Sequence, residues 1–315
     1  MNPLSQMVSE DGLMKPEIKL EGVIVPMLTP MKENEDLDLD GAKRLTDWLI
    51  EKGVHGGFPV SNVGEAGKLG MEEKKSLIKA VVEAANGRVP VVAGVGFPEA
   101  RRTIELTRYA VDVGADAGLI MQPYGCFKPS DEALYDYYRT INDSVDEFPL
   151  VLYNIPVTSG YELSPELVAK CADLSNIVAI KDSGGDIKKH EYMLKFAGDR
   201  IKIFQGVDIL FFPSLAVGAK GGFLGGGNFA ADIEVGLYNS FVGGDVKSAI
   251  ELHNKIVTFF NGIIEMGKLV SSLKCATSMV SVHVGPERKP SETLTKNEVQ
   301  RIRNVLEEVG LLDAR

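Results

Sequence analysis

The 315-residue chain is 44% hydrophobic and 25% charged, which is typical of a globular protein with an extensive core. Its formal net charge of −10 argues against nucleic acids and anionic membrane surfaces as partners. No stretch approaches the roughly 20 apolar residues that span a bilayer, and the first 20 residues lack the apolar core of a signal peptide. We therefore expect a soluble, cytoplasmic protein.

Eight short apolar segments alternate with amphipathic segments along the chain. The strand candidates, rich in β-branched residues, are 22–30, 55–61, 90–97, 116–123, 149–156, 177–183, 202–208 and 221–228. The segments between them have helical periodicity. In the first of these, at 38–53, Asp40 is the expected N-cap and Gly53 the stop. In the next, at 71–87, the apolar residues share one face and Gly87 predicts the helix end.

The strand candidates are apolar throughout, which is typical of parallel sheets covered on both faces. Eight successive βα units predict a (β/α)8 TIM barrel rather than a doubly wound sheet. The GxGxxG motif that a Rossmann fold would carry after the first strand is absent. The glycine-rich segment 221–227 lacks the lysine and the hydroxyl residue of a P-loop, which argues against a nucleotide site there.

The chain divides into three predicted parts. We expect a mobile N-terminal extension at 1–20, a catalytic barrel domain at 21–243 and an additional C-terminal helical block at 244–315 that packs on the barrel. The alternative role for this block is a surface for oligomerisation.

The cysteines and histidines are scattered along the sequence. The cysteines lack CxxC spacing, which predicts free thiols in a reducing compartment: Cys126, Cys171 and Cys275. The histidines form neither an HExxH motif nor a helix-spaced pair: His55, His190, His253 and His283. We therefore expect no metal and no other cofactor.

The most unusual strand end is that of segment 177–183, where Lys181 directly follows an apolar run. One interpretation is a lysine that extends to solvent or pairs with Asp182. The other is an amine held among apolar residues, where desolvation lowers its pKa. A neutral amine can add to a ketone and form a Schiff base, which stabilises negative charge on the adjacent carbon without a metal.

Two further strand ends carry groups suited to the same chemistry. Tyr153 is a candidate proton shuttle on the preceding strand; otherwise it is a rim aromatic that packs against loops. The turn SNVGEAG at 61–67 offers backbone amides that suit a carboxylate; otherwise it is an ordinary polar turn. Their combination on successive strand ends favours catalysis.

These motifs resemble the pyruvate-dependent class I aldolase superfamily of dihydrodipicolinate synthase and N-acetylneuraminate lyase. The similarity extends from about Gly22 to the C-terminal helices. It rests chiefly on YNIP at 153–156, followed at the family's spacing by the lysine of AIKDS. Supporting positions are Thr29 with Pro30, Gly64 with Glu65, QGVD at 205–208 and GAKGGFLGGGN at 218–228.

The resemblance implies roles for individual residues. Lys181 is the expected Schiff-base lysine, and Tyr153 is the tyrosine that shuttles protons. The backbone amides of Asn62 and Val63 hold the pyruvate carboxylate. The other expected substrate contacts are Ser61, Thr158, Gly206, Asp208 and Gly225. Members of the family commonly assemble, which implies a homo-oligomer, a dimer or tetramer, that binds a small 2-oxo acid.

Several positions depart from the family's pattern. The hydroxyl residues of the turn are Asn62 and Val63 here, and the second tyrosine of the proton relay is Gly125. The arginine that dihydrodipicolinate synthases carry after YNIP is Thr158, which disfavours lysine biosynthesis. An acidic residue that sialic acid lyases carry on strand seven is Ile209, which argues against sialic acid.

The segments KDSGGD and GGFLGGGNF most resemble 2-keto-3-deoxy sugar acid aldolases and dehydratases. We therefore expect a lyase that cleaves such an acid to pyruvate and an aldehyde, or dehydrates it. The alternatives are a 4-hydroxy-tetrahydrodipicolinate (dihydrodipicolinate) synthase, an N-acetylneuraminate lyase-like enzyme, and a non-catalytic protein that binds pyruvate or another 2-oxo acid. The presence of both Lys181 and Tyr153 favours catalysis over binding alone.

Overall fold

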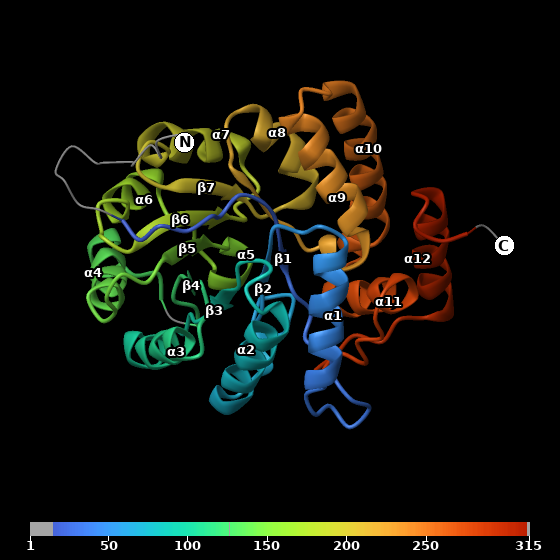
Figure 1. Ribbon diagram of the computed structural model, residues 1–315, viewed down its shortest axis with the longest axis horizontal. Coiled ribbons are helices and arrows are strands. Elements are labelled where there is room, and N and C mark those ends of the chain that lie inside the picture. Colours follow the sequence, from blue (N-terminus) through green and yellow to red (C-terminus); the bar gives the residue numbers. More distant parts are fainter. Residues whose placement is uncertain (1–14, 126, 314–315) are drawn as a thin grey trace.

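The computed structural model describes residues 15–125 and 127–313. Its centre is a sheet of eight parallel strands in the order β2-β1-β8-β7-β6-β5-β4-β3 (Figure 1). The strands are β1 (Gly22–Pro26), β2 (Gly56–Phe58), β3 (Val92–Gly94), β4 (Ala117–Met121), β5 (Leu150–Asn154), β6 (Ile177–Asp182), β7 (Lys202–Gln205) and β8 (Gly221–Phe223). A parallel bridge between Gly57 and Val91 closes the sheet into a barrel. The predicted (β/α)8 fold is confirmed.

Helices surround the barrel and follow its strands. They are α1 (Leu39–Glu51), α2 (Met71–Ala85), α3 (Ala100–Asp112), α4 (Asp131–Asn142), α5 (Pro156–Ser159), α6 (Pro165–Cys171), α7 (Ile187–Ala197), α8 (Phe211–Ala216) and α9 (Gly227–Val242). The C-terminal block adds α10 (Val246–Gly262), α11 (Leu269–Val280) and α12 (Lys296–Glu308). Short 3-10 helices are η1 (Ala66–Lys68), η2 (Asp208–Leu210) and η3 (Ile264–Met266).

Some local predictions need correction, and every observed strand is shorter than the segment predicted for it. The eighth strand is shorter than 221–228, because α9 begins at Gly227 and takes up the end of the glycine-rich segment. Helix α1 is capped by Asp38, whose carboxylate accepts a hydrogen bond from the Gly41 amide, so the prediction of Asp40 as N-cap was wrong. Asp40 lies in the first turn, where its negative charge is favourable to the helix dipole.

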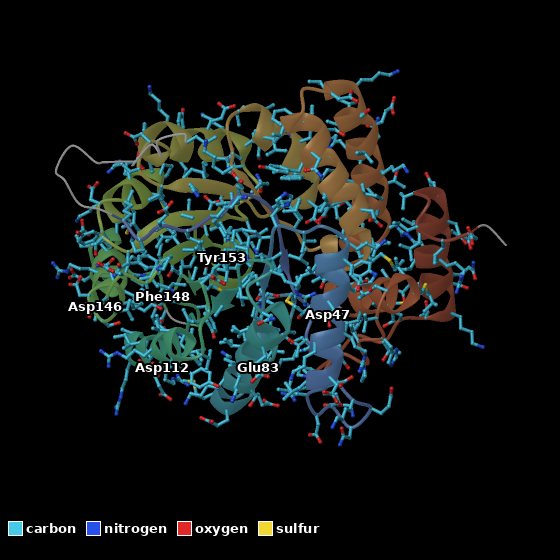
Figure 2. The ribbon with its side chains drawn as sticks, in the orientation of Figure 1. Asp47, Glu83, Asp112, Asp146, Phe148 and Tyr153 are labelled. Atoms are coloured by element: carbon cyan, nitrogen blue, oxygen red, sulfur yellow. The ribbon has the colours of Figure 1, made fainter. Side chains whose placement is uncertain are left out.

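The barrel interior is filled by its own apolar cluster. Side chains from alternate strand positions meet there, including Ile24, Phe58, Val151, Phe204 and Phe223. Figure 2 shows Tyr153 within the barrel, whereas Asp47, Glu83 and Asp112 lie on the outer helices. The interior is therefore a packed core whose functional groups are confined to the strand ends.

The described part of the N-terminal segment contacts the barrel. Leu20 is fully buried, and the Lys15 ammonium donates hydrogen bonds to the carbonyls of Ala172, Leu174 and Ile177. The first 14 residues of the predicted extension lie outside the described residues.

The C-terminal block lies against one side of the barrel (Figure 1). Helices α10 and α11 pack on α9, and α12 packs on α10 and α11. Within the described residues, no helix has the length and apolar character needed to cross a membrane.

Candidate active site

Lys181 lies inside the barrel, near the carboxyl end of β6. Every residue of this strand is buried, and Lys181 is only 3% exposed. Side chains alternate along a strand, so Lys181 points to the same interior face as Ala179. Its register partners are Tyr153 in β5 and Phe204 in β7.

The surroundings of the Lys181 amine are aromatic. The Nζ atom is 4.1 Å from the ring centre of Tyr153, 5.2 Å from that of Phe58 and 5.8 Å from that of Phe223. Burial lowers the pKa of Lys181 from 10.5 to about 7, an effect that the charge of Asp208 partly opposes. A large fraction of this amine is consequently neutral at physiological pH.

The alternative in which Lys181 pairs with Asp182 does not fit this arrangement. The Asp182 side chain points away from the interior and accepts hydrogen bonds from the Asn154 side chain at 2.8 Å and the Gly184 amide at 3.0 Å. Its second oxygen lies 3.0 Å from Nδ1 of the buried His190 on α7. These contacts tie the end of β6 to β5 and to α7, and so fix the backbone that carries Lys181.

Tyr153 stands beside Lys181 at the end of β5. It is buried, and its ring packs edge-on against Phe58 with ring centres 6.4 Å apart. Burial raises the pKa of Tyr153, and a hydrogen bond with the Ser183 side chain opposes this only in part. The phenol therefore keeps its proton at neutral pH and is placed to donate it next to the amine.

The turn after β2 is held by Ser61. The Ser61 hydroxyl donates to the Met27 carbonyl and accepts from the Gly64 amide, both at 2.9 Å. Within the described residues, the backbone amides of Asn62 and Val63 have no acceptor. Two such amides at a strand end can receive a carboxylate, as the sequence predicted.

A buried ion pair supports this turn from the C-terminal block. Glu65 adopts a left-handed backbone conformation with φ of 61°, and its carboxylate lies 2.7 Å from the ammonium of Lys274 on α11. The other Glu65 oxygen accepts from the Arg288 amide at 2.8 Å. Lys274 could not be identified from the sequence, because no local pattern links α11 with a turn some 200 positions earlier in the chain.

The remaining predicted contact residues have distinct environments. A Cβ atom at Gly206 would lie 3.0 Å from Cε of Lys181, so glycine leaves room for the lysine stem. Gly225 is buried, yet a Cβ there would meet nothing within 4 Å, which indicates open space at the end of β8. Asp208 is 5% exposed and accepts from the Gly226 amide at 2.6 Å. Thr158 is half-buried in α5.

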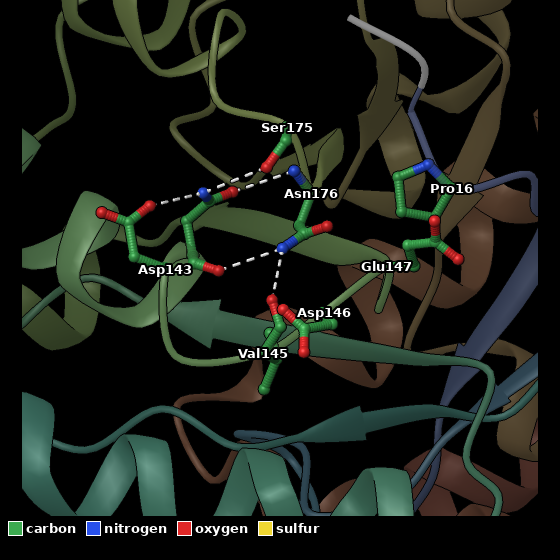
Figure 3. A pocket seen from close by; sticks show the side chains of 8 residues that line it. Pro16, Asp143, Val145, Asp146, Glu147, Ser175 and Asn176 are labelled. Atoms are coloured by element: carbon green, nitrogen blue, oxygen red, sulfur yellow. Dashed lines mark hydrogen bonds between the residues drawn. The ribbon is translucent and has the colours of Figure 1, made fainter.

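A pocket of about 420 Å³ lies elsewhere on the molecule (Figure 3). Its lining residues are Pro16, Asn142, Asp143, Val145, Asp146, Glu147, Ser175 and Asn176. These residues precede β5 and β6, so the pocket is at the amino-terminal end of the barrel, opposite Lys181. Among the described residues, no group of three or more His, Cys, Asp or Glu side chains is placed to hold a metal ion.

A parallel (β/α)8 barrel with a buried lysine and a buried tyrosine on neighbouring strand ends is the arrangement of lyases that act through a Schiff base, the class I aldolases. Residues 19–309 match the model of the dihydrodipicolinate synthetase family, and the chain belongs to this family. The family-level resemblance predicted from the motifs is confirmed.

Relatives span nearly the whole chain. An uncharacterized DapA-like lyase of Pyrobaculum aerophilum is 36% identical over 304 residues, which are 94% of this chain and all of the relative. A 4-hydroxy-tetrahydrodipicolinate synthase of Methanothrix thermoacetophila is 34% identical over 287 residues, or 90% of this chain and 95% of the relative. Among solved structures, YagE from E. coli K12, crystallised in complex with pyruvate, aligns with a TM-score of 0.90 and 30% identity over 94% of this chain and 100% of that one.

Proposed function

We propose that Lys181 forms a Schiff base with the 2-oxo group of a 2-keto-3-deoxy sugar acid and that Tyr153 transfers the protons. The observation that carries this proposal is the pairing, in register, of a buried amine whose pKa is about 7 with a buried phenol. The products are pyruvate and an aldehyde, or a dehydrated acid. The sugar acid is the finer part of the proposal, because the relatives above are named as lyases or as 4-hydroxy-tetrahydrodipicolinate synthases.

The steps follow from the two side chains. The neutral Lys181 amine adds to C2, and Tyr153 donates its proton to the resulting hydroxyl, which leaves as water. The protonated imine then accepts the electron pair of the C3–C4 bond while the phenolate takes the C4 hydroxyl proton, so an aldehyde departs. The enamine regains this proton at C3, and water releases pyruvate and the free amine.

The Asn62 and Val63 amides are the proposed seat of the substrate carboxylate. Both amides lack an acceptor within the described residues, and Ser61 and the Glu65–Lys274 pair hold the turn in place. Backbone donors replace the hydroxyl groups that the side chains of the turn do not supply. Tyr153 is then the proposed proton-transfer residue, since Gly125 has no hydroxyl to supply a second one.

A sugar acid is favoured by the groups around the strand ends. The segment 155–163 after β5 has no lysine or arginine for a second carboxylate, and Thr158 offers a hydroxyl instead. Asp208 can accept hydrogen bonds from substrate hydroxyls. A dihydrodipicolinate synthase would have to bind a second carboxylate, which these groups do not suit.

Borohydride trapping with pyruvate, followed by peptide mass mapping, tests the Schiff base. We expect one reduced adduct, on Lys181. Lys74 is the matched control, because it is also buried and its pKa is lowered to about 8. Lys181→Met should abolish the adduct, and Lys74→Met should retain it. The assignment would be refuted by an adduct on Lys74. It would also be refuted if the wild-type protein formed no adduct at a pyruvate concentration that labels a control aldolase.

Substrate and proton transfer need separate assays. A panel of 2-keto-3-deoxy acids, with aspartate semialdehyde plus pyruvate alongside, should show turnover with the sugar acids only. Lys181→Ala should abolish turnover, whereas Tyr153→Phe should slow it and leave measurable imine formation. Trapping without turnover on any acid would favour the non-catalytic alternative.

We also propose that the chain forms a homo-oligomer. The support is the resemblance to the family, together with the C-terminal block packed on one side of the barrel. Light scattering tests this proposal, and a mass of one chain of 34.1 kDa would contradict it.

A further inference from the structure

A second buried carboxyl group lies behind Asp208. Glu234, on α9, has no exposed surface. Within the described residues it forms no ion pair with a lysine, arginine or histidine. A charged carboxylate in such a place is strongly unfavourable unless it is paired, so we expect Glu234 to be uncharged.

Gly226 shows how close the two carboxyl groups are. A Cβ atom at this glycine would lie 2.7 Å from Oε1 of Glu234 and 2.8 Å from Oδ1 of Asp208. Both oxygens therefore converge on one small backbone position, between the end of β8 and the start of α9. Two buried carboxyl groups that converge on one position hold one proton between them, because both cannot be ionised.

The proton belongs to Glu234. The Gly226 amide donates to Asp208 at 2.6 Å, and a hydrogen bond from an amide favours the ionised form of its acceptor. Burial and the charge of Asp208 raise the pKa of Glu234 well above its ordinary value. Burial also raises the pKa of Asp208, but hydrogen bonds with Glu234 and with backbone amides oppose part of this shift.

Other charged groups do not compete for this proton. Titratable side chains on the neighbouring helices have other partners: Lys52 at the end of α1 pairs with Asp232, His253 of α10 packs on Phe212, and Lys274 of α11 pairs with Glu65. Strand β1 and helix α8 contain no titratable residue. On the other side, Asp208 acts on Lys181.

We propose that Glu234 is a positioning residue that stays protonated and donates its carboxyl hydrogen to Asp208, so that Asp208 remains a carboxylate beside Lys181. This inference rests on the proposed role of Lys181. The negative charge of Asp208 raises the pKa of Lys181 and so opposes part of the effect of burial. The same charge stabilises the protonated imine, because the positive charge of the imine lies where the ammonium was. Glu234 therefore affects the reaction without contact with the substrate.

Matched variants separate this role from packing. Glu234→Gln keeps a donor to Asp208, and Glu234→Met has similar volume but no donor. We expect the pH midpoint of imine trapping with pyruvate to be kept in Glu234→Gln and to fall by about one pH unit in both Glu234→Met and Asp208→Asn, since the carboxylate beside the amine is lost in each. Equal midpoints in Glu234→Met and wild type, or equal shifts in Glu234→Gln and Glu234→Met, would overturn the proposal.

Infrared spectroscopy can detect the proposed proton on Glu234 without any measurement of the reaction. At pH 7 the wild type should show the carbonyl band of a buried protonated carboxyl group, and this band should vanish in Glu234→Gln but persist in Tyr153→Phe. Its absence from wild type would overturn the proposal. If the band behaves as expected but pyruvate is not trapped on Lys181, the proposed function fails while the shared proton stands.

Discussion

Lowering the pH is the most direct perturbation of the proposed nucleophile. Only the neutral amine can attack a ketone, so imine formation should follow the deprotonated fraction of Lys181. The structure lowers the pKa of this lysine from 10.5 to about 7, chiefly by burial between the rings of Tyr153, Phe58 and Phe223.

The magnitude follows from these two values. At pH 7 about half of Lys181 is neutral, whereas an ordinary lysine is neutral in about one molecule in 3,000. Burial therefore increases the concentration of nucleophile roughly a thousand-fold, equivalent to about 4 kcal/mol. Below pH 6 the neutral fraction should fall about tenfold for each pH unit, and above pH 8 it should be constant.

The assay is the initial rate of borohydride trapping with pyruvate between pH 5 and 9, with the adduct quantified by mass spectrometry. Pyruvate stays ionised over this range, so the profile reports the enzyme. Tyr153→Phe is the control, because it retains Lys181 and most of the aromatic surroundings. A trapping rate that still rises tenfold between pH 8 and pH 9 would refute the argument that burial lowers the pKa of Lys181 to about 7.

Three further substitutions test neighbouring parts of the structure. Lys181→Met should raise the free energy of unfolding at pH 7 by roughly 2–4 kcal/mol, because the buried lysine holds its proton less tightly in the folded chain than in the unfolded chain. This gain should shrink as the pH rises from 7 to 10.5, and chemical denaturation at both pH values measures it. Gly206→Ala places a Cβ in steric conflict with the Ser183 hydroxyl and 3.0 Å from Lys181 Cε, so trapping should slow at least about tenfold while the free energy of unfolding falls by only about 1–3 kcal/mol. An unchanged trapping rate would contradict the tight packing of the lysine stem. Lys274→Met removes the closer of two ammonium groups from the buried Glu65 and leaves only Lys68, 3.4 Å from the other carboxylate oxygen, so denaturation should show a loss of up to about 3–5 kcal/mol. Glu65→Gln in the same chain should largely restore this loss, and a double variant as unstable as the single one would show that the pair is not the cause.

The sequence predicted the barrel well because its signals are local. Continuous apolar runs separated by amphipathic segments identify parallel strands covered by helices, and all eight predicted strands are present. Lys181 and Tyr153 could be identified as candidates because each ends such a run, and the register then places them side by side.

The unpredicted features depend on contacts between distant segments. Lys274 and Glu65 meet only because α11 folds back over the barrel, and Glu234 meets Asp208 only because α9 starts at Gly227. Neither pair has a spacing that a sequence pattern could detect. The prediction of the α1 N-cap failed for another reason. Asp38 and Asp40 are both acceptable N-cap residues by type, and the backbone geometry determines that Asp38 is the cap.

The contact between α11 and the turn after β2 links the C-terminal block to the proposed carboxylate site. A fragment that ended with the barrel at residue 243 would keep Lys181 and Tyr153 but lack Lys274 and the Arg288 amide, and Lys68 would be the remaining partner of Glu65 among the described residues. The turn proposed to hold the carboxylate would lose its support while the nucleophile remained in place. If the turn binds the carboxylate as proposed, a chain without the C-terminal helices would retain the reactive amine but would orient its substrate poorly.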